Sequence, residues 1–196
     1  MNPWFGKALI LVSIVSIVII RAPHGRRNGK IAVVESWKGW LEILLLALMW
    51  FAAMILPLVA ILTPVLSFAD YPLHPLAFSI GVVALFAGLW LFHRSHADLG
   101  KNWSVTLEIR EAHQLVTSGV YRLIRHPMYT AIFLQAIAQA LLLSNWLAGP
   151  ACLFAFLLMF AFRVGAEERM MQKKFGEAYV DYMSRTHRLI PRLWLS

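Results

Sequence analysis

The stretch that decides the fold is PMYTAIFLQAIAQALLLSNWLAGPACLFAFLLMFAFRV, residues 127–164. Two apolar runs, residues 127–143 and 151–164, flank the connection SNWLAGP, whose Asn, Gly and Pro are typical of a tight turn. The pattern predicts a short helical hairpin, tilted or not fully crossing an apolar layer. Polar and charged side chains crowd both of its free ends, and those ends are the first places to look for chemistry.

The remaining composition predicts a membrane protein. Of 196 residues, 60% are hydrophobic and only 14% charged, whereas a soluble domain is nearer half apolar and a quarter charged. Three more apolar segments, residues 4–20, 40–66 and 75–92, precede the hairpin. We therefore predict an all-α integral membrane protein with about five transmembrane helices, forming a single membrane domain over residues 1–196.

Local features refine this prediction. Pro57 and Pro64 lie inside the second apolar segment and predict a kink or an early stop there. The first segment is interpreted as a retained helix rather than a cleaved signal peptide, because no small-residue cleavage site precedes the basic RAPHGRRNGK. Cys152 is the single cysteine, which excludes an internal disulfide and a cysteine-based zinc site.

The basic residues predict the orientation. Of the 18 Lys and Arg residues, all but Lys7 fall within residues 21–38, 94–125 or 163–192. This is the positive-inside pattern, and it places the N-terminus outside and the polar stretches and the C-terminus in the cytoplasm. The net charge of +8 then reflects topology and anionic lipid headgroups rather than nucleic acid. We expect a cytoplasmic roof over the helix ends and a C-terminal amphipathic helix within residues 167–194.

Nucleotide motifs are missing from the sequence. It contains neither GxGxxG after a strand nor GxxxxGK[ST], which excludes a Rossmann or P-loop nucleotide site. HRSH, residues 93–96, together with Asp98 has two interpretations, metal ligands or an interfacial polar cap on the third segment. Its position at a helix end favours the cap, and we predict no metal site.

GVYRLIRHPMYT, residues 119–130, opens the hairpin. Pro127 suits the first position of a helix, and it biases His126 away from helical geometry, so His126 is the expected N-cap. The free N–H groups and dipole of that helix start favour a negative group nearby. With Tyr121 and Tyr129 the stretch predicts a polar, aromatic pocket mouth; the alternative is an interfacial belt of Tyr and Arg.

FRVGAEE, residues 162–168, closes the hairpin. Arg163 and Glu167 are four residues apart and thus on one helix face. Charged groups at the end of an apolar helix are functional candidates by default, although an ion pair that merely ends the helix has the same pattern. Gln135 and Gln139 are also four apart; contacts between helices are favoured for them over lining a cavity.

Taken in order, HQLVTSGVYRLIRHPMY, then RVGAEE, then FGEAYVDYMSRTHRLIP resemble the isoprenylcysteine carboxyl methyltransferase family, which is itself similar to the phospholipid N-methyltransferases. The resemblance covers roughly residues 99–192, so that residues 99–196 would be the catalytic half and residues 1–98 the N-terminal transmembrane helices. It implies a helical membrane enzyme that uses S-adenosylmethionine without a Rossmann domain.

The resemblance also implies roles for individual residues. The cofactor would be lined, mostly by backbone, at His113, Gln114, Leu115 and Val116. Its pocket would be completed by Tyr121, His126, Pro127, Met128 and Tyr129. Arg163 would face the substrate and Glu167 would touch the cofactor. Thr106 stands where some relatives place a glutamine, a departure that leaves its role open, and Asn102 and Trp103 would help to close the roof.

Four functions remain open on these residues. The first is methylation of a lipophilic carboxylate, with prenylcysteine-like compounds or lipidated proteins as acceptors. The second keeps the cofactor and changes the acceptor to a lipid amine or a small thiol, for which Glu167 or Glu168 would serve as base. A nicotinamide-dependent membrane reductase and a non-enzymatic membrane assembly factor are the third and fourth. The order RHPxY then RxxxEE favours the first two.

Overall fold

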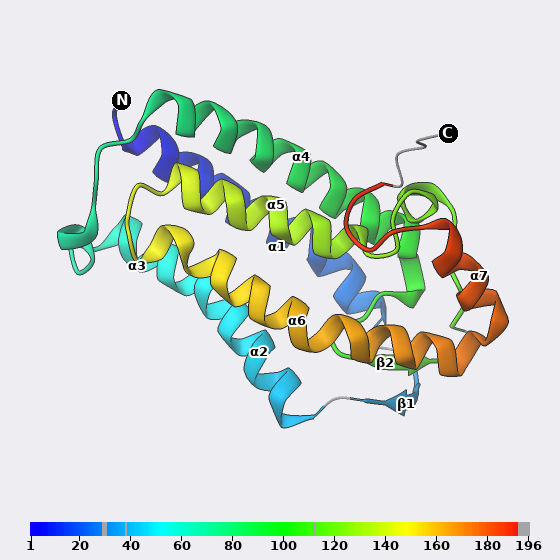
Figure 1. Ribbon diagram of the computed structural model, residues 1–196. Helices are drawn as coiled ribbons and strands as arrows, with labels where there is room; N and C mark the ends of the chain where they lie inside the picture. Colours follow the sequence, from blue (N-terminus) through cyan, green and yellow to red (C-terminus); the bar gives the residue numbers. More distant parts are fainter. Residues whose placement is uncertain (29–30, 38, 112, 192–196) are drawn as a thin grey trace.

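The computed structural model describes residues 1–28, 31–37, 39–111 and 113–191. Its elements in chain order are α1 (Trp4–Asn28), β1 (Val33–Ser36), α2 (Trp40–Trp50), the π-helical turn η1 (Phe51–Ile55), α3 (Leu56–Leu62), η2 (Ser67–Ala69), α4 (Pro75–Leu99), η3 (Gly100–Asn102), β2 (Glu108–Arg110), η4 (Gly119–Arg122), α5 (Pro127–Leu142), α6 (Ala148–Phe175) and α7 (Glu177–Arg185). Figure 1 shows the long helices lying side by side, with α7 and the strand pair gathered at one end.

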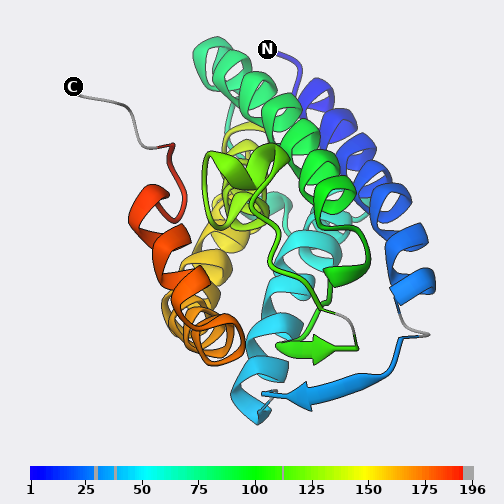
Figure 2. The ribbon, with the colours of Figure 1, turned by 90° about the vertical axis from the view of Figure 1, so that its right-hand side faces the viewer.

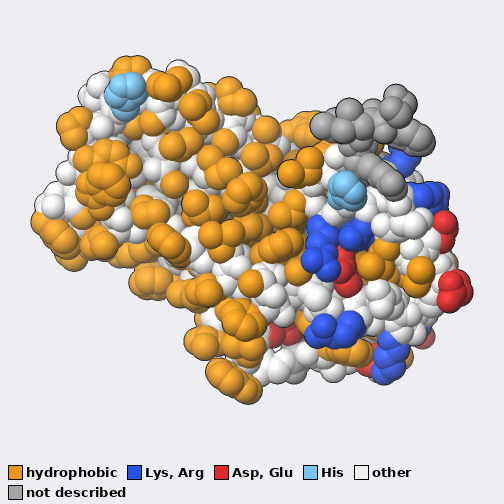
Figure 3. All heavy atoms as spheres, in the orientation of Figure 1, with side chains coloured by type: hydrophobic (Ala, Val, Ile, Leu, Met, Phe, Trp, Pro, Cys, Tyr) orange, Lys and Arg blue, Asp and Glu red, His pale blue; other side chains and the backbone are white. Residues whose placement is uncertain are grey.

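The helices confirm the prediction of an all-α integral membrane fold. Four stretches of described helix are long and apolar enough to cross a membrane: Trp4–Asn28, Trp40–Leu62, Pro75–Asn102 and Ala148–Phe175. Helix α5 is apolar but only 16 residues long, shorter than the roughly 20 residues of a perpendicular crossing. Large apolar side chains lie exposed on the outer faces of these helices and cover the body of the molecule in Figure 3. That surface suits hydrocarbon rather than water.

The second apolar segment is one interrupted helix. Residues 40–62 run through α2, η1 and α3, with the π-helical turn immediately before Pro57. Proline lacks an N–H group and its ring clashes with the carbonyl four residues earlier, and a widened turn relieves both problems. Thr63 is extended and ends the helix before Pro64, as expected for a residue that precedes proline. The predicted interruption and early stop are both present.

Helix α5 lies between α4, α1 and α6. Its close approach to α4 depends on glycine: a Cβ added at Gly81 would lie 2.7 Å from the side chain of Leu142, and one at Gly88 would lie 3.2 Å from the carbonyl of Ala131. Gln135 accepts a hydrogen bond from Ser13 and donates to the carbonyl of Leu85, while Gln139 donates to the carbonyls of Ala52 and Ala148. Both glutamines thus join helices, the interpretation favoured from sequence, and both also line the cavity beneath the roof, which was the alternative.

The hairpin is present, but α6 is much longer than the apolar run that predicts it. That run ends near residue 164, whereas the helix continues to Phe175 over 28 residues. Hydropathy marks only the part of a helix that meets lipid, so it misses the part that leaves the membrane. Asn145 organises the connection: its amide donates to Leu66 O and Asp70 Oδ1, both at 2.7 Å, and its oxygen accepts from Ala148 N at 2.9 Å.

The roof contains two short strands that the all-α prediction omitted. β1 and β2 pair antiparallel, with Glu35 opposite Ile109 and Ser36 opposite Glu108, and they lie beside the start of α2 in Figure 2. Strands of three or four residues carry too little alternation to be seen in a sequence. The 3₁₀ turns η3 and η4, on either side of β2, complete the roof.

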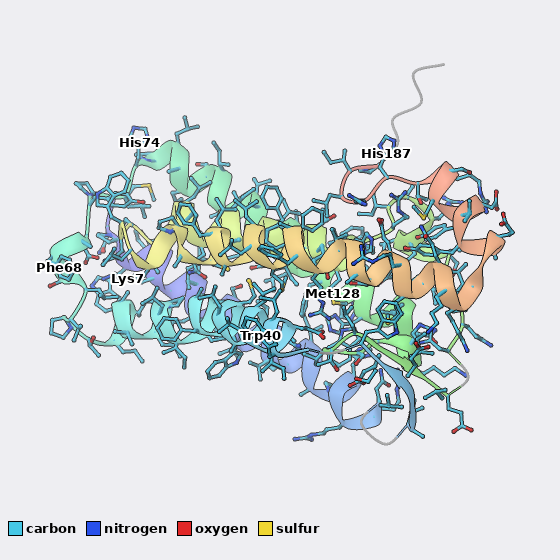
Figure 4. All side chains as sticks on the ribbon, turned by 60° about the horizontal axis from the view of Figure 1, so that its bottom comes forward. Lys7, Trp40, Phe68, His74, Met128 and His187 are labelled. Carbon is cyan, nitrogen blue, oxygen red and sulfur yellow. The ribbon has the colours of Figure 1, made fainter. Side chains whose placement is uncertain are left out.

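Most described charges gather at this roof end of the molecule, as Figure 3 shows. At the opposite end Lys7 pairs with Asp70 at 3.5 Å. Figure 4 labels Lys7 and His74 at that end and Met128 and His187 toward the roof. Three basic residues of the predicted pattern, Lys30, Lys38 and Arg192, lie outside the described residues.

The C-terminal tail is amphipathic, as predicted, but it is divided in two. Its first part continues α6, and Gly176, with φ +54°, breaks the helix before α7. This left-handed geometry favours glycine, which has no Cβ. Tyr179 and Tyr182 form the buried face of α7, and the Tyr182 hydroxyl donates to the carbonyl of Tyr121 at 2.6 Å. The tail therefore packs on the roof.

Candidate active site

A cavity of about 340 Å³ lies beneath the roof. Its wall is contributed by α1, α2, η1, α4, α5 and α6 and by the roof segments between α4 and α5. The volume is within the range of small-molecule sites, which are mostly apolar with a few convergent polar groups. Polar side chains meet at the roof end, while Ile10, Ile14, Leu46 and Met49 line the part that reaches into the helices.

Ten of the eleven side chains predicted for the site line this cavity: His113, Gln114, Leu115, Val116, Tyr121, His126, Met128, Tyr129, Arg163 and Glu167. Pro127 is the one predicted residue absent from the lining. It is buried at the first turn of α5, where its missing N–H group costs no hydrogen bond. Pro127 therefore begins the helix rather than contacting the cavity.

His126 occupies the predicted N-cap position, with φ −123° and ψ 61°, yet its side chain does not cap the helix. The imidazole turns instead toward two carboxylates of α6: Nε2 lies 3.3 Å from Glu168 Oε1, and Nδ1 lies 3.8 Å from Glu167 Oε1. The start of α5 and the end of α6 are thereby joined at the cavity wall.

Glu167 is oriented by α5. The Tyr129 hydroxyl donates to Glu167 Oε2 at 2.8 Å, and the Tyr129 side chain is itself buried. The carboxylate keeps 30% of its surface exposed and lines the cavity. Tyr129 therefore fixes the position of the Glu167 carboxylate, which can still accept a hydrogen bond from a ligand in the cavity.

Arg163 has a partner that the sequence analysis missed. Its Nη2 donates to the carbonyl of Val105 at 2.6 Å and lies 3.4 Å from Glu42 Oε1. Its Nε is buried and has no hydrogen-bond partner among the described residues. Glu42 is the one charged residue within residues 40–62, and a lone charge in an apolar segment is the signal that identifies it as a functional candidate.

Glu168 is the centre of a separate network. It accepts hydrogen bonds from Arg125 Nε at 3.2 Å and from Arg188 Nε at 3.1 Å, besides its contact with His126. These hydrogen bonds raise the pKa of the Arg188 guanidinium above its usual value. Backbone bonds from Arg125 N to His187 O and from His126 N to Arg188 O reinforce the junction. Glu168 lies outside the cavity lining, so it holds the roof together.

The HRSH segment is also part of the roof support. His96 is fully buried, with Nδ1 2.9 Å from the carbonyl of Phe92 and its ring 4.9 Å from that of Trp103. Asp98 pairs with Arg94 and accepts a hydrogen bond from the backbone of Val120. No group of three potential metal ligands occurs among the described residues. The cap interpretation fits Arg94 and Asp98, while the roof folds over His96 and buries it.

The roof tyrosines remain neutral at physiological pH. Burial raises the pKa of the Tyr121 hydroxyl well above its usual value, and burial likewise raises the pKa of Tyr182. Asn102 and Trp103, expected to help close the roof, also line the cavity, and Asn102 Oδ1 accepts a hydrogen bond from Gln114 N at 3.0 Å. Thr106 lines it too and donates to Glu108.

This fold and site define a class of protein: a helical membrane protein with a partly enclosed cavity whose polar end lies beneath a roof. Residues 79–173 match the model of the isoprenylcysteine carboxyl methyltransferase (ICMT) family. A probable protein-S-isoprenylcysteine O-methyltransferase of Oryza sativa subsp. indica is 27% identical over 189 residues, covering 95% of this chain and 94% of that protein. The protein-S-isoprenylcysteine O-methyltransferase of Tribolium castaneum is 34% identical over 58% of this chain and 41% of its own length.

A solved structure of the eukaryotic intramembrane Ras methyltransferase ICMT shares the fold. It superposes with a TM-score of 0.56 at 24% identity, covering 93% of this chain, and this chain spans 62% of that one. The match over residues 79–173 and the similarity to protein-S-isoprenylcysteine O-methyltransferases over nearly the whole chain support the isoprenylcysteine carboxyl methyltransferase family, and the chain is a membrane methyltransferase.

Proposed function

We propose that the protein transfers a methyl group from S-adenosylmethionine to the carboxylate of a lipophilic acceptor of the isoprenylcysteine type. The observation that carries the proposal is Arg163, whose side chain is 10% exposed and lines a cavity that is polar at one end and apolar at the other. The names of the relatives, protein-S-isoprenylcysteine O-methyltransferases, support the acceptor class.

The roof end of the cavity fits the cofactor by its chemistry. S-adenosylmethionine supplies, when bound, an electrophilic methyl group on a sulfonium. The residues from His113 to Val116 lie in an irregular segment and line the cavity, so their backbone is available for hydrogen bonds. Glu167 offers a carboxylate to an amine or a ribose. The aromatic faces of Trp103 and Tyr129 stabilise a cation by roughly 0.5–2 kcal/mol.

A carboxylate acceptor makes a modest demand on the protein. It is ionised at neutral pH, so no residue has to remove a proton, and the chain needs only to hold it in line with the methyl group. An arginine suits that task because its planar donors match a carboxylate and its charge does not depend on pH. Arg163 on α6, which lines the cavity, would take this role.

The acceptor's apolar part would enter from the lipid side between α1 and α2. A groove of about 220 Å³ there shares several wall residues with the main cavity, and it is lined by Ile17, Val18, Arg21, Ala22, Trp50 and Met54. The basic pattern of the sequence supports an orientation with the roof and Arg163 on the cytoplasmic side, where S-adenosylmethionine would be reached from solution.

An amine or thiol acceptor is less well supported. It would need a base, and Glu168 is already bound by Arg125 and Arg188 outside the cavity. Glu167 would be left for that task, although it already accepts the hydrogen bond of Tyr129. The names of the relatives also favour O-methylation over a reductase or a non-enzymatic role.

Two measurements on detergent-purified protein test the proposal. In the first, S-adenosylhomocysteine and NADPH are compared by thermal shift; stabilisation by the former alone is expected. In the second, methyl transfer from labelled cofactor is measured to an S-prenylated cysteine and to its matched carboxamide. Transfer to the free acid alone supports a carboxylate acceptor. Equal transfer to the carboxamide, or no stabilisation by S-adenosylhomocysteine, would refute the proposal.

A further inference from the structure

Glu42 is a carboxylate in an unusual place. It lies in the first turn of α2, and only 7% of its side chain is exposed. A buried charge is costly unless it is paired and hydrogen-bonded. Glu42 has such partners from two distant parts of the chain: Oε1 accepts from Leu107 N at 2.8 Å and lies 3.4 Å from Arg163 Nη2. It thus joins α2, the roof and α6.

The geometry of Arg163 shows what this contact does. Its Nη2 is used by Glu42 and by the carbonyl of Val105, while Nε has no hydrogen-bond partner among the described residues. Arg163 lines the cavity, whereas Glu42 is absent from its lining. Glu42 therefore contacts the guanidinium from outside the cavity and leaves the cavity side of Arg163 free of a carboxylate partner among the described residues.

The contact also keeps Arg163 away from Glu167. The two side chains are one helical turn apart, a spacing at which Arg and Glu usually pair. The ion pairs of the described residues nevertheless join Arg163 to Glu42 and place Glu167 beside His126, with no pair between Arg163 and Glu167. A guanidinium bound to Glu167 would be neutralised within the cavity and lost to an anionic acceptor.

We infer that Glu42 is a positioning residue for the acceptor carboxylate: together with Val105 O it fixes the guanidinium of Arg163 at the cavity wall and prevents its pairing with Glu167. The inference rests on the proposed function. An arginine side chain carries roughly 2 kcal/mol of rotamer entropy, so fixing it before the acceptor arrives favours acceptor binding. Cofactor binding does not depend on this step.

The test is Glu42→Gln, which keeps an oxygen for Leu107 N and removes the charge. We expect the KM for the S-prenylated cysteine to rise on the order of 10-fold, because a hydrogen bond to a charged group is lost, with kcat and S-adenosylhomocysteine binding little changed. Glu35→Gln is the matched control: Glu35 pairs with Lys173 at the exposed roof, and its loss should leave the KM unchanged.

Two further variants test whether Glu42 acts by positioning Arg163 or only by stabilising the fold. In an Arg163→Lys background, Glu42→Gln should add nothing to the KM, because residues that act through one another are not additive. Glu42→Asp keeps the charge but shortens the side chain by one methylene, and a raised KM is expected for it too. This second variant tests the inference if the Glu42→Gln protein does not fold. An unchanged KM in either folded variant, or full additivity with Arg163→Lys, would overturn the inference.

A binding measurement separates this inference from the proposed function. Thermal stabilisation by the S-prenylated cysteine, measured without turnover, is expected in the wild type and should be weaker in Glu42→Gln. Wild-type protein that is not stabilised would refute the carboxylate-acceptor function itself. Equal stabilisation of both proteins would refute the role of Glu42 alone.

Discussion

Two arginine–carboxylate clusters involve residues five positions apart on α6, Arg163 and Glu168, and they differ in how many of their polar groups are hydrogen-bonded. Around Glu168 both carboxylate oxygens accept hydrogen bonds, with donors from Arg125, His126 and Arg188. Around Arg163 the nearest carboxylate is 3.4 Å away, and Nε and Glu42 Oε2 are buried without hydrogen-bond partners among the described residues.

The difference indicates that the Glu168 cluster has a structural role and the Arg163 cluster a functional one. Buried polar groups are normally hydrogen-bonded, and a group left without a partner calls for an explanation. The Glu168 cluster is satisfied and lies outside the cavity lining, where it ties α5, α6 and the C-terminal tail together. Arg163 is unsatisfied and lines the cavity, as expected of a group whose partner is a ligand.

The largest expected effect is on turnover, from Arg163→Ala. Removing the charged partner of a bound carboxylate typically costs 2–5 kcal/mol, so kcat/KM for a carboxylate acceptor should fall on the order of 100-fold or more. S-adenosylhomocysteine should still stabilise the variant in a thermal shift. Arg163→Lys keeps the charge but not the planar guanidinium, and its kcat/KM should lie between those of the wild type and Arg163→Ala. Normal turnover by Arg163→Ala would end its role as acceptor clamp.

The next effect is on stability, from Glu168→Gln. The substitution leaves Arg125, whose side chain is 10% exposed, without its counter-charge, and breaking a buried pair typically costs about 3–5 kcal/mol. A large fall in the thermal denaturation midpoint in detergent is expected, with or without acceptor. A variant of unchanged stability that loses only acceptor binding would place Glu168 in the active site instead.

Glu167→Gln tests whether Glu167, unlike the adjacent Glu168, contributes to cofactor binding rather than to stability. The amide oxygen can still accept from Tyr129, so the denaturation midpoint should change little. Loss of a hydrogen bond to a charged group costs about 1.5–3 kcal/mol, and S-adenosylhomocysteine affinity, measured by titration, should fall on the order of 10-fold or more. Unchanged affinity with a lowered midpoint would assign Glu167 to the support cluster.

The smallest effect is expected from Arg188→Ala. Its side chain is 48% exposed, and exposed ion pairs contribute about 1 kcal/mol or less, while Arg125 remains on Glu168. The denaturation midpoint should fall by only a few degrees and the KM for the acceptor should not change. A loss as large as that of Glu168→Gln would show that Arg188, rather than Arg125, is the essential partner.

Much of this arrangement was predictable from local sequence. Hydropathy places the membrane helices because the bilayer imposes a length and an apolar surface on each of them independently. Pro57 and Pro64 predict the interruptions for a similarly local reason. Ten of the eleven residues predicted for the site from the stretches around His113, His126 and Arg163 line the cavity. The short strands and the full length of α6 were missed, since neither has a strong local pattern.

The sequence by itself determined the membrane fold, the polar ends of the hairpin and the family. Only the tertiary structure decided which carboxylate meets Arg163 and which of two adjacent glutamates faces the cavity. Neighbouring residues on a helix point about 100° apart. Glu167 therefore faces the cavity and Glu168 faces Arg125 and Arg188, although the two residues are adjacent in the sequence. Glu42 and Arg163 come from opposite halves of the chain, and only the packing of α2, α6 and the roof brings them together.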